Sequence, residues 1–309
     1  MRTLIYDIPA EDDGRPISRL VRSRLGLSYH LFAQLKLQEA ILLDGTPVRA
    51  NHIAHTGQRL CVRIEEPRRH LSSAPPESIP IEILYRDEDL IVINKPAPLP
   101  CQSTQRQRTG TLENRLVHHF AAEGEFVFRP INRLDKGTSG LMAAALHPHA
   151  QMLLSEKLHT DDFVREYMAL VCGQLSPPAG TVSAPIDKAD GATVRREVRP
   201  DGKHAVTHYE TESFDPARNL SLVKLRLETG RTHQIRVHMA HMGCPVFGDF
   251  LYGEESTALP GRFALHSHRL AFTHPLSGCA MSFCVPFPPE LSAAAAGLKG
   301  AEAAPSERP

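Results

Sequence analysis

The sequence predicts an α+β protein made of a small N-terminal module and a larger domain. Its 309 residues fit one large domain or two unequal ones, at about 100–200 residues per domain. Strand-like and helix-like hydrophobic patterns are interspersed along the chain, as in the hairpin pattern of residues 79–94 and the helix pattern of residues 111–121. Residues 65–80, rich in Pro and Ser, lack apolar periodicity and separate the two parts.

The composition excludes several classes of protein. Hydrophobic residues make up 41% and charged residues 23% of the chain, which excludes wholesale disorder, collagen and a coiled-coil rod. No apolar run approaches the roughly 18 residues of a membrane span, and residues 1–7 lack the blocks of a secretion signal, so we expect a cytoplasmic protein with no membrane contact. The six cysteines form no Cys-x-x-Cys pair, which indicates free thiols. The 35 basic and 35 acidic residues cancel, which argues against non-specific coating of nucleic acid but permits a local basic face.

The predicted boundaries are 1–66 for the module, 67–78 for the linker, 79–288 for the larger domain and 289–309 for a disordered tail. The tail is mainly Ala, Gly and Pro with a few charges. It is therefore expected to bury too little apolar area to offset its ordering entropy.

An arginine-rich amphipathic helix is predicted within residues 14–38. The apolar positions at helical spacing are Ile17, Leu20, Val21 and Leu25. The basic positions, with no acidic residue among them, are Arg15, Arg19, Arg22, Arg24 and Lys36. A second helix over residues 32–40 is followed by a strand entering a tight turn at Asp44-Gly45, and a further strand covers residues 60–64. From the pattern alone, such a charge run fits an ordinary solvated helix face as well as it fits a binding surface.

The order of these elements resembles the α-L RNA-binding module found in a small-subunit ribosomal protein and in some tRNA synthetases. The resemblance covers about fifty residues, including the segments 45–51 and 56–60. It implies that Arg15, Arg19, Arg22 and Arg24 contact phosphates. Such contacts give affinity and salt dependence but no base specificity.

Asp135 is a candidate catalytic carboxylate in the larger domain. It lies in a polar turn that ends at Gly140 and leads into an apolar strand over residues 141–146. A carboxylate held in place just before a strand begins can act as a nucleophile or base. An aspartate that merely caps the turn is the alternative, and for an isolated aspartate it is the commoner case.

A second polar turn follows an alternating strand over residues 220–227. Arg231 lies in this turn, where its guanidinium can reach a carboxylate. A helix is expected next, with Thr232 as N-cap and Gly243 as the C-terminal stop. Its predicted buried stripe consists of Ile235, Met239 and Met242; Gln234, Arg236, His238 and His241 lie partly off it.

Four separated segments together resemble the RluA-type RNA pseudouridine synthase family. In order, they are residues 92–96 (VINKP), 133–140 (RLDKGTSG), 165–167 (REY) and 229–238 (TGRTHQIRVH). The resemblance runs from about residue 79 to residue 288. It implies a pseudouridine synthase fold: an α+β domain with flanking helices around a largely antiparallel, mixed sheet and a central cleft.

The resemblance also implies roles for individual residues. Asp135 corresponds to the family's catalytic aspartate, Arg231 to the arginine that pairs with it, and Tyr167 to the aromatic residue that stacks on the uracil. Residues expected to support the turn or contact substrate are Arg133, Thr138, Leu225, Gln234 and Arg236, with Leu225 or a neighbour on its strand as an apolar wall.

The chemistry implied is the isomerisation of uridine to pseudouridine in RNA. It needs neither a redox step nor water, so we expect no cofactor and no metal. An ionised Asp135 could attack the ribose, attack the ring or abstract the 2′ proton, and the sequence leaves these three routes open. We expect RNA as the partner, ribosomal RNA ahead of transfer RNA, and a monomer without an obligate protein partner.

Rival interpretations have less support. His233, His238 and His241 suggest zinc, but no His-Glu-x-x-His or Cys/His quartet accompanies them. A glycosidase requires two facing carboxylates; Asp249 is a possible second one, but Gly248-Asp249 is typical of a turn. No Gly-x-Ser-x-Gly elbow supports a serine hydrolase. The open alternatives are a non-catalytic, RNA-binding ribosome assembly factor on the same scaffold and a synthase acting on transfer RNA.

Overall fold

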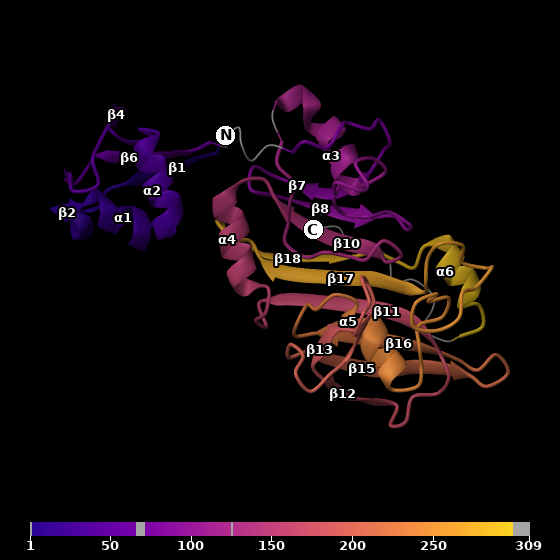
Figure 1. Cartoon of the computed structure of the whole chain (residues 1–309). Helices are drawn as coiled ribbons and strands as arrows, with labels where there is room; N and C mark the ends of the chain where they lie inside the picture. Colours follow the sequence, from indigo (N-terminus) through magenta and orange to yellow (C-terminus); the bar gives the residue numbers. More distant parts are fainter. Residues whose placement is uncertain (1, 66–71, 125, 299–309) are drawn as a thin grey trace.

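The computed structural model describes residues 2–65, 72–124 and 126–298. A small N-terminal module lies beside a larger domain built on one long sheet (Figure 1). Among the described residues, no helix is both long and apolar enough to cross a lipid bilayer. Residues 67–71 of the predicted linker and 299–309 of the predicted tail lie outside the described residues.

The N-terminal module has its own four-stranded sheet, in the order β1-β6-β3-β4, and its own hydrophobic core. Its elements are β1 (Arg2–Asp7), the 3-10 helix η1 (Ala10–Asp12), β2 (Arg15–Pro16), α1 (Ile17–Ser23), α2 (Tyr29–Leu37), β3 (Ile41–Leu43), β4 (Thr46–Pro47), β5 (Ile53–Ala54) and β6 (Arg59–Ile64). Ile17, Leu20 and Val21 of α1 are buried, as their spacing predicts. Asp44 and Gly45 both have positive φ, which is what a two-residue hairpin turn requires.

Two features of the module differ from the sequence prediction. Helix α2 begins at Tyr29 rather than at residue 32, because the Ser28 hydroxyl accepts a hydrogen bond from the Leu31 N–H at 3.2 Å and caps the helix earlier. Strand β1 has no counterpart in the prediction; it pairs antiparallel with β6 along its whole length.

The larger domain is built on a ten-stranded sheet, ordered β12-β15-β16-β11-β17-β10-β8-β7, with β18 paired to β17 and β9 to β10. The strands are β7 (Glu82–Arg86), β8 (Leu90–Lys95), β9 (Arg129–Pro130), β10 (Ser139–Ala145), β11 (Phe163–Cys172), β12 (Ala179–Ser183), β15 (Val206–Asp215), β16 (Leu220–Leu227), β17 (Leu265–Thr273) and β18 (Ala280–Cys284). Only the β10–β17 pair in this sheet is parallel, which confirms the predicted mixed, largely antiparallel sheet.

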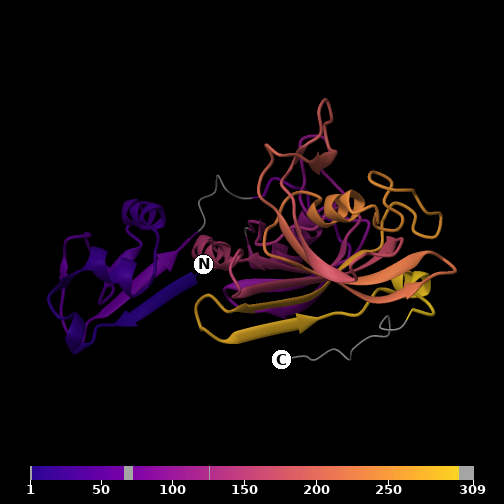
Figure 2. The same cartoon turned by 90° about the horizontal axis from the view of Figure 1, so that it is seen from below.

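Helices and a small hairpin cover this sheet. They are α3 (Leu112–Phe120), the 3-10 helix η3 (Ala121–Glu123), α4 (Pro148–Lys157), α5 (Gln234–His241), α6 (Pro289–Ala294), and the hairpin β13 (Ile186–Lys188) with β14 (Arg196–Val198). Ile91 and Ile93 of β8 pack into the core that includes α3 and α5, whereas Leu90 and Val92 face the core that includes α4. Strand β8 is therefore buried on both faces, which explains its unbroken apolar run. Figure 2 shows α5 standing over one face of the sheet.

The parallel contact between β10 and β17 depends on a glycine. Gly140 has φ +105°, and a Cβ built on it would lie 2.2 Å from the backbone oxygen of Ser267. No larger residue fits this approach, which joins the two halves of the sheet directly beside the Asp135 turn.

The predicted disordered tail is wrong for residues 289–298. Helix α6 forms there, and Leu291, Ala295 and Leu298 are buried against Leu170 and Leu222 of the sheet. Arg218 donates hydrogen bonds to the carbonyls of Ala294 and Ala296, which satisfies the C-terminal end of the helix. The composition obscures this helix because only three side chains in residues 289–298 are buried, among many Ala residues.

Candidate active site

Four segments of the larger domain meet around one small, open cavity. They are the turn after β9, strand β11, the end of β16 and the start of α5. The residues that line the cavity include Asp135, Thr138, Tyr167, Arg231, His233 and Arg236.

Asp135 sits in a tightly held turn between β9 and β10. The Thr138 N–H donates to the Asp135 carbonyl at 3.1 Å, and the Leu99 N–H donates to the Lys136 carbonyl at 2.9 Å. The Asn132 amide bridges to β10 by donating to the Leu141 carbonyl and accepting from the Ala143 N–H. About a quarter of the Asp135 side chain is exposed, so the carboxylate is anchored but reachable from the cavity.

The guanidinium that contacts Asp135 belongs to Arg236, and the predicted pairing with Arg231 is therefore wrong. Arg236 Nη1 lies 3.1 Å from Asp135 Oδ2. Arg231 also lines the cavity, but its Nε donates to the carbonyl of His204 at 2.9 Å. The motif supplies two arginines five residues apart, and only the path of the turn into α5 decides which one faces the carboxylate.

Asp249 holds the other edge of Arg236. Its carboxylate accepts from Arg236 Nε at 2.6 Å and from Nη2 at 2.8 Å, and both side chains are buried. The guanidinium also contacts two aromatic rings, with its central carbon 4.1 Å from the centroid of Phe263 and 4.9 Å from that of Tyr252. Burial alone would lower the pKa of Arg236, but Asp249 and Asp135 outweigh it and raise that pKa, so the guanidinium stays charged.

The N-terminus of α5 differs from the prediction. The N-cap is His233, not Thr232, and no side chain caps it. Gln234 stabilises the preceding turn: its Oε1 accepts from the Arg231 N–H and the Thr229 hydroxyl, and its Nε2 donates to Val206 and Thr207. Gln234 lines the cavity, but its amide oxygen and nitrogen already make hydrogen bonds within the protein. It is therefore less available to bind substrate than the sequence predicts.

Tyr167 forms the floor of the cavity. It is almost completely buried on β11, and burial raises its pKa, so the hydroxyl is protonated at neutral pH. Leu225, the predicted apolar wall, is its cross-strand neighbour on β16 and is fully buried. The neighbour on that strand that lines the cavity is Leu227, two positions along. The other apolar lining residues are Leu134, Ile235 and Leu265.

Arg133 and Thr138 lie on the rim and in the wall of the same cavity. Thr138 is buried inside the Asp135 turn, as expected of a support. Arg133 is exposed and lines the opening. The structure thus brings these two residues together with Asp135, Tyr167, Arg231 and Arg236.

Lys95 is a buried cation beside the site. It belongs to the VINKP segment, and the sequence patterns indicated no role for it. It is fully buried, and its Nζ donates to the carbonyls of Leu99 at 2.7 Å and Pro96 at 3.1 Å. Burial lowers the pKa of Lys95 to about 8, although the charge of Asp135 opposes this shift. Lys95 therefore holds the proline-rich loop, and the Leu99 N–H of that loop bonds to the Asp135 turn.

The histidines do not assemble the zinc site considered from the sequence. His238 is engaged at both ring nitrogens, by the Thr207 hydroxyl at 2.9 Å and the Ala184 carbonyl at 2.9 Å. His241 is exposed at the far end of α5.

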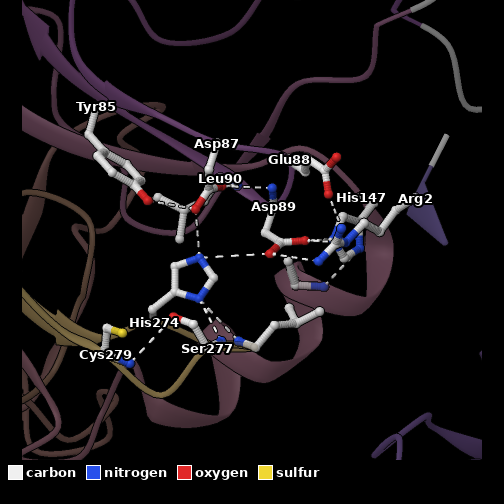
Figure 3. A network of polar contacts seen from close by, with 12 residues as sticks. Arg2, Tyr85, Asp87, Glu88, Asp89, Leu90, His147, His274, Ser277 and Cys279 are labelled. Carbon is white, nitrogen blue, oxygen red and sulfur yellow. Dashed lines mark hydrogen bonds and ion pairs between the residues drawn. The ribbon is translucent and has the colours of Figure 1, made fainter. Parts of the chain in front are cut away.

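A different cluster, of Asp87, Asp89 and His274, places one ligand atom of each residue within 4.8 Å of one another. Figure 3 shows that these atoms already have protein partners. His274 Nε2 lies 2.8 Å from Asp87, and Asp89 pairs with His147 at 2.9 Å and with Arg2 at 2.8 Å. Because Arg2 belongs to β1, the cluster joins the N-terminal module to the larger domain, and Arg2 supplies the positive charge that a metal would otherwise bring.

The predicted phosphate-binding arginines of the module fall into two pairs. Arg15 and Arg24 make ion pairs with the buried Asp12, at 3.1 and 2.8 Å, and Arg24 holds the pKa of Asp12 down to about 2. Arg19 and Arg22 are exposed and make no ion pair with any residue that the structure describes.

Comparisons with known proteins agree on one family. The sequence model of RNA pseudouridylate synthases matches residues 89–241. The chain is 34% identical to an uncharacterized RNA pseudouridine synthase of Bacillus subtilis, YhcT, over 92% of this chain and 93% of that protein. It is 37% identical to the ribosomal large subunit pseudouridine synthase D of Xanthomonas campestris, over 87% and 85% of the two chains.

A solved structure supports the same assignment. Human RNA pseudouridylate synthase domain containing 1 superimposes with a TM-score of 0.55 and 27% identity, covering 71% of this chain and 89% of that one. Near full-length similarity at this level of identity, together with the fold and the four motifs, shows that the chain belongs to the RluA-type family of RNA pseudouridine synthases.

Proposed function

We propose that the protein converts uridine to pseudouridine in large-subunit ribosomal RNA and that Asp135 is its catalytic carboxylate. The observation that carries the proposal is the position of Asp135, anchored at a small open cavity in contact with the charged Arg236. The relatives named as ribosomal large subunit pseudouridine synthases support the choice of RNA.

The isomerisation exchanges one bond of the nucleoside for another. The bond from ribose C1′ to uracil N1 breaks, C1′ then bonds to C5 of the turned ring, and the C5 proton leaves while N1 takes up a proton. Asp135 acts on the sugar or the ring as a carboxylate in direct contact with the Arg236 guanidinium. The uracil must leave its stack to enter the cavity, which costs a few kcal/mol.

Tyr167 offsets part of this cost. Stacking of a base on an aromatic side chain is worth about 1–3 kcal/mol, and the Tyr167 ring faces the same cavity as Asp135. Leu227 and Leu265 line the same cavity, and we expect them to exclude water from the edge of a bound ring. Exclusion of water strengthens the electrostatic effect of Arg236 on the reacting atoms.

The test is tritium release from RNA labelled at uracil C5, comparing wild type with Asp135→Asn. We expect release by wild type and none by the variant. Asp162→Asn, an exposed turn aspartate away from the cavity, is the matched control and should release tritium at the wild-type rate. Equal release by Asp135→Asn and wild type would remove Asp135 from the mechanism.

The RNA target is tested by mapping pseudouridines in total RNA from cells with and without the protein. We expect the missing sites to lie in large-subunit ribosomal RNA. Sites in transfer RNA alone would favour the transfer RNA synthase. If no site is missing and the purified protein releases no tritium from any cellular RNA, the non-catalytic assembly factor is the better interpretation.

We also propose that the N-terminal module holds the RNA through Arg19 and Arg22, the two exposed arginines without an acidic partner among the described residues. Replacing both by Ala should reduce the slope of log affinity against log salt by about 1–2. Arg15→Ala is the control, because Arg15 already makes an ion pair with the buried Asp12, and should change the slope less. An unchanged slope in the double variant would contradict an RNA role for α1.

We further propose that the protein acts in the cytoplasm as a monomer. All six cysteines are free, which fits a reducing compartment.

A further inference from the structure

His233 occupies an unusual backbone position at the edge of the cavity. It is the N-cap of α5 and has φ +59° and ψ +19°, in the left-handed region that residues other than glycine rarely adopt. Its side chain is mostly buried and lines the same cavity as Asp135. Strained conformations of this kind cluster at functional sites, which indicates that the His233 side chain has a role in the cavity.

Its hydrogen bonds indicate which ring nitrogen carries the proton. The backbone N–H of Arg196 donates to the Tyr252 hydroxyl oxygen at 2.9 Å. The same hydroxyl lies 2.8 Å from His233 Nδ1 and has no other acceptor among the described residues, so its proton goes to Nδ1. Burial lowers the pKa of His233, which keeps the ring neutral at neutral pH. A neutral ring that accepts at Nδ1 must carry its proton on Nε2.

The Nε2–H faces the reacting carboxylate without bonding to it. Nε2 lies 3.9 Å from Asp135 Oδ2, too far for a hydrogen bond. Asp135 already has a cationic partner in Arg236. The Nε2–H is therefore available for an acceptor atom of a bound substrate next to Asp135.

We propose that His233 is a further catalytic residue, which donates a hydrogen bond from Nε2 to a carbonyl oxygen of the uracil ring while that ring is detached from the ribose. The proposal rests on the uridine isomerisation proposed above. When the C1′–N1 bond breaks with its electron pair left on the ring, negative charge spreads onto O2 and O4. A preorganised N–H donor stabilises such charge more in the detached state than in the substrate. His233 keeps its proton throughout.

The symmetry of uracil makes one donor sufficient for both halves of the reaction. A half-turn about the axis through N3 and C6 exchanges N1 with C5 and O2 with O4. A donor that meets O2 before the turn therefore meets O4 after it. His233 can hold the ring in register for both bond-breaking at N1 and bond-making at C5 without moving.

The first test removes the side chain without backbone strain. Glycine adopts positive φ freely, so His233→Gly deletes the donor while leaving the turn relaxed. His233→Gln restores an N–H close to the position of Nε2. We expect the single-turnover rate to fall at least tenfold in His233→Gly, with RNA affinity by filter binding unchanged, and to recover at least in part in His233→Gln. A His233→Gly rate within twofold of wild type, or no recovery in His233→Gln, would overturn the proposal.

The second test changes the acceptor. Sulfur accepts hydrogen bonds more weakly than oxygen, so RNA with 2-thiouridine or 4-thiouridine at the target should react more slowly with wild type than uridine RNA does. In His233→Gly this difference between substrates should shrink towards none. A thio effect of equal size in both proteins would exclude a bond from His233 to either oxygen. An inactive wild type would overturn the proposed function itself, whereas an active wild type matched by His233→Gly would overturn only the role of His233.

Discussion

Asp135 and Asp249 share one guanidinium, that of Arg236. Nη1 contacts Asp135 at 3.1 Å, while Nε and Nη2 are held by Asp249 at 2.6 and 2.8 Å. The buried pair with Asp249 sets the orientation of the guanidinium, and the single contact that remains points to the cavity. The Asp135 carboxylate is therefore contacted by a residue more than a hundred positions away in sequence.

The two arginines of the motif should differ in their effect on the reaction. Arg236→Lys loses the planar fork that spans both carboxylates, so kcat should fall by about 100-fold or more. Arg231→Lys keeps a cation at the cavity edge and should reduce kcat by less than about tenfold. Single-turnover tritium release measures both. The reverse order would mean that Arg231 moves onto Asp135 when RNA binds.

Asp249 should act only through Arg236. Asp249→Asn keeps the shape of the side chain but loses the charged, bidentate contact, so kcat should fall by about tenfold while RNA affinity is retained. In the Arg236→Lys background the same change should have less than a twofold further effect, because the geometry is already lost. Losses that multiply independently in the double variant would show that Asp249 has a separate role.

Gly137 should tolerate no side chain. A Cβ at this position would lie 2.6 Å from Cε1 of Phe263, the ring that packs on Arg236. Gly137→Ala should lower the free energy of unfolding by about 1–3 kcal/mol and also reduce kcat. Phe263→Leu in the same chain should recover part of the stability, because the smaller side chain vacates that space. Urea unfolding compares the single and double variants; no recovery would place the strain elsewhere.

Lys95 should make stability depend on pH. Because burial lowers its pKa from 10.5 to about 8, the folded protein binds fewer protons than the unfolded chain between these values. Stability from this group therefore rises as pH increases from about 8 towards 10.5 and is lost as pH falls through 8. Between pH 7.5 and 9.5, wild type should gain about 2 kcal/mol relative to Lys95→Met.

Urea unfolding at the two pH values gives this difference. Cys172 and Cys244 are common to both proteins and cancel in the comparison. Cys101 interacts electrostatically with Lys95, so both proteins carry Cys101→Ala. A difference that stays constant with pH would mean that Lys95 keeps its ordinary proton affinity in the folded protein.

Sequence patterns identified much of the fold because burial follows periodicity. Strand β16 and the glycine that ends α5 agree with the prediction, since alternation and a positive φ at Gly243 are local properties. The segments that contribute Asp135, Tyr167 and Arg231 do meet at one cavity, as the resemblance implies.

Contacts set by tertiary structure could not be read in this way. Charged residues on a helix are expected to face solvent, so Arg236 at the third position of α5 did not suggest a buried partner of Asp135. Asp249 follows a glycine and also fits a turn, and its second role appears only when the loop folds back on α5. The left-handed backbone conformation of His233 could not be predicted either. A glycine would have indicated a positive φ at this position, whereas a histidine does not.

Helix α6 also bears on how the domain can be shortened. Leu291, Ala295 and Leu298 shield Leu170 and Leu222, which belong to two central strands. In a protein cut at Pro288, Leu170 and Leu222 would be exposed to water as part of an apolar surface patch. Such a fragment would be prone to self-association even though every residue around the cavity is retained.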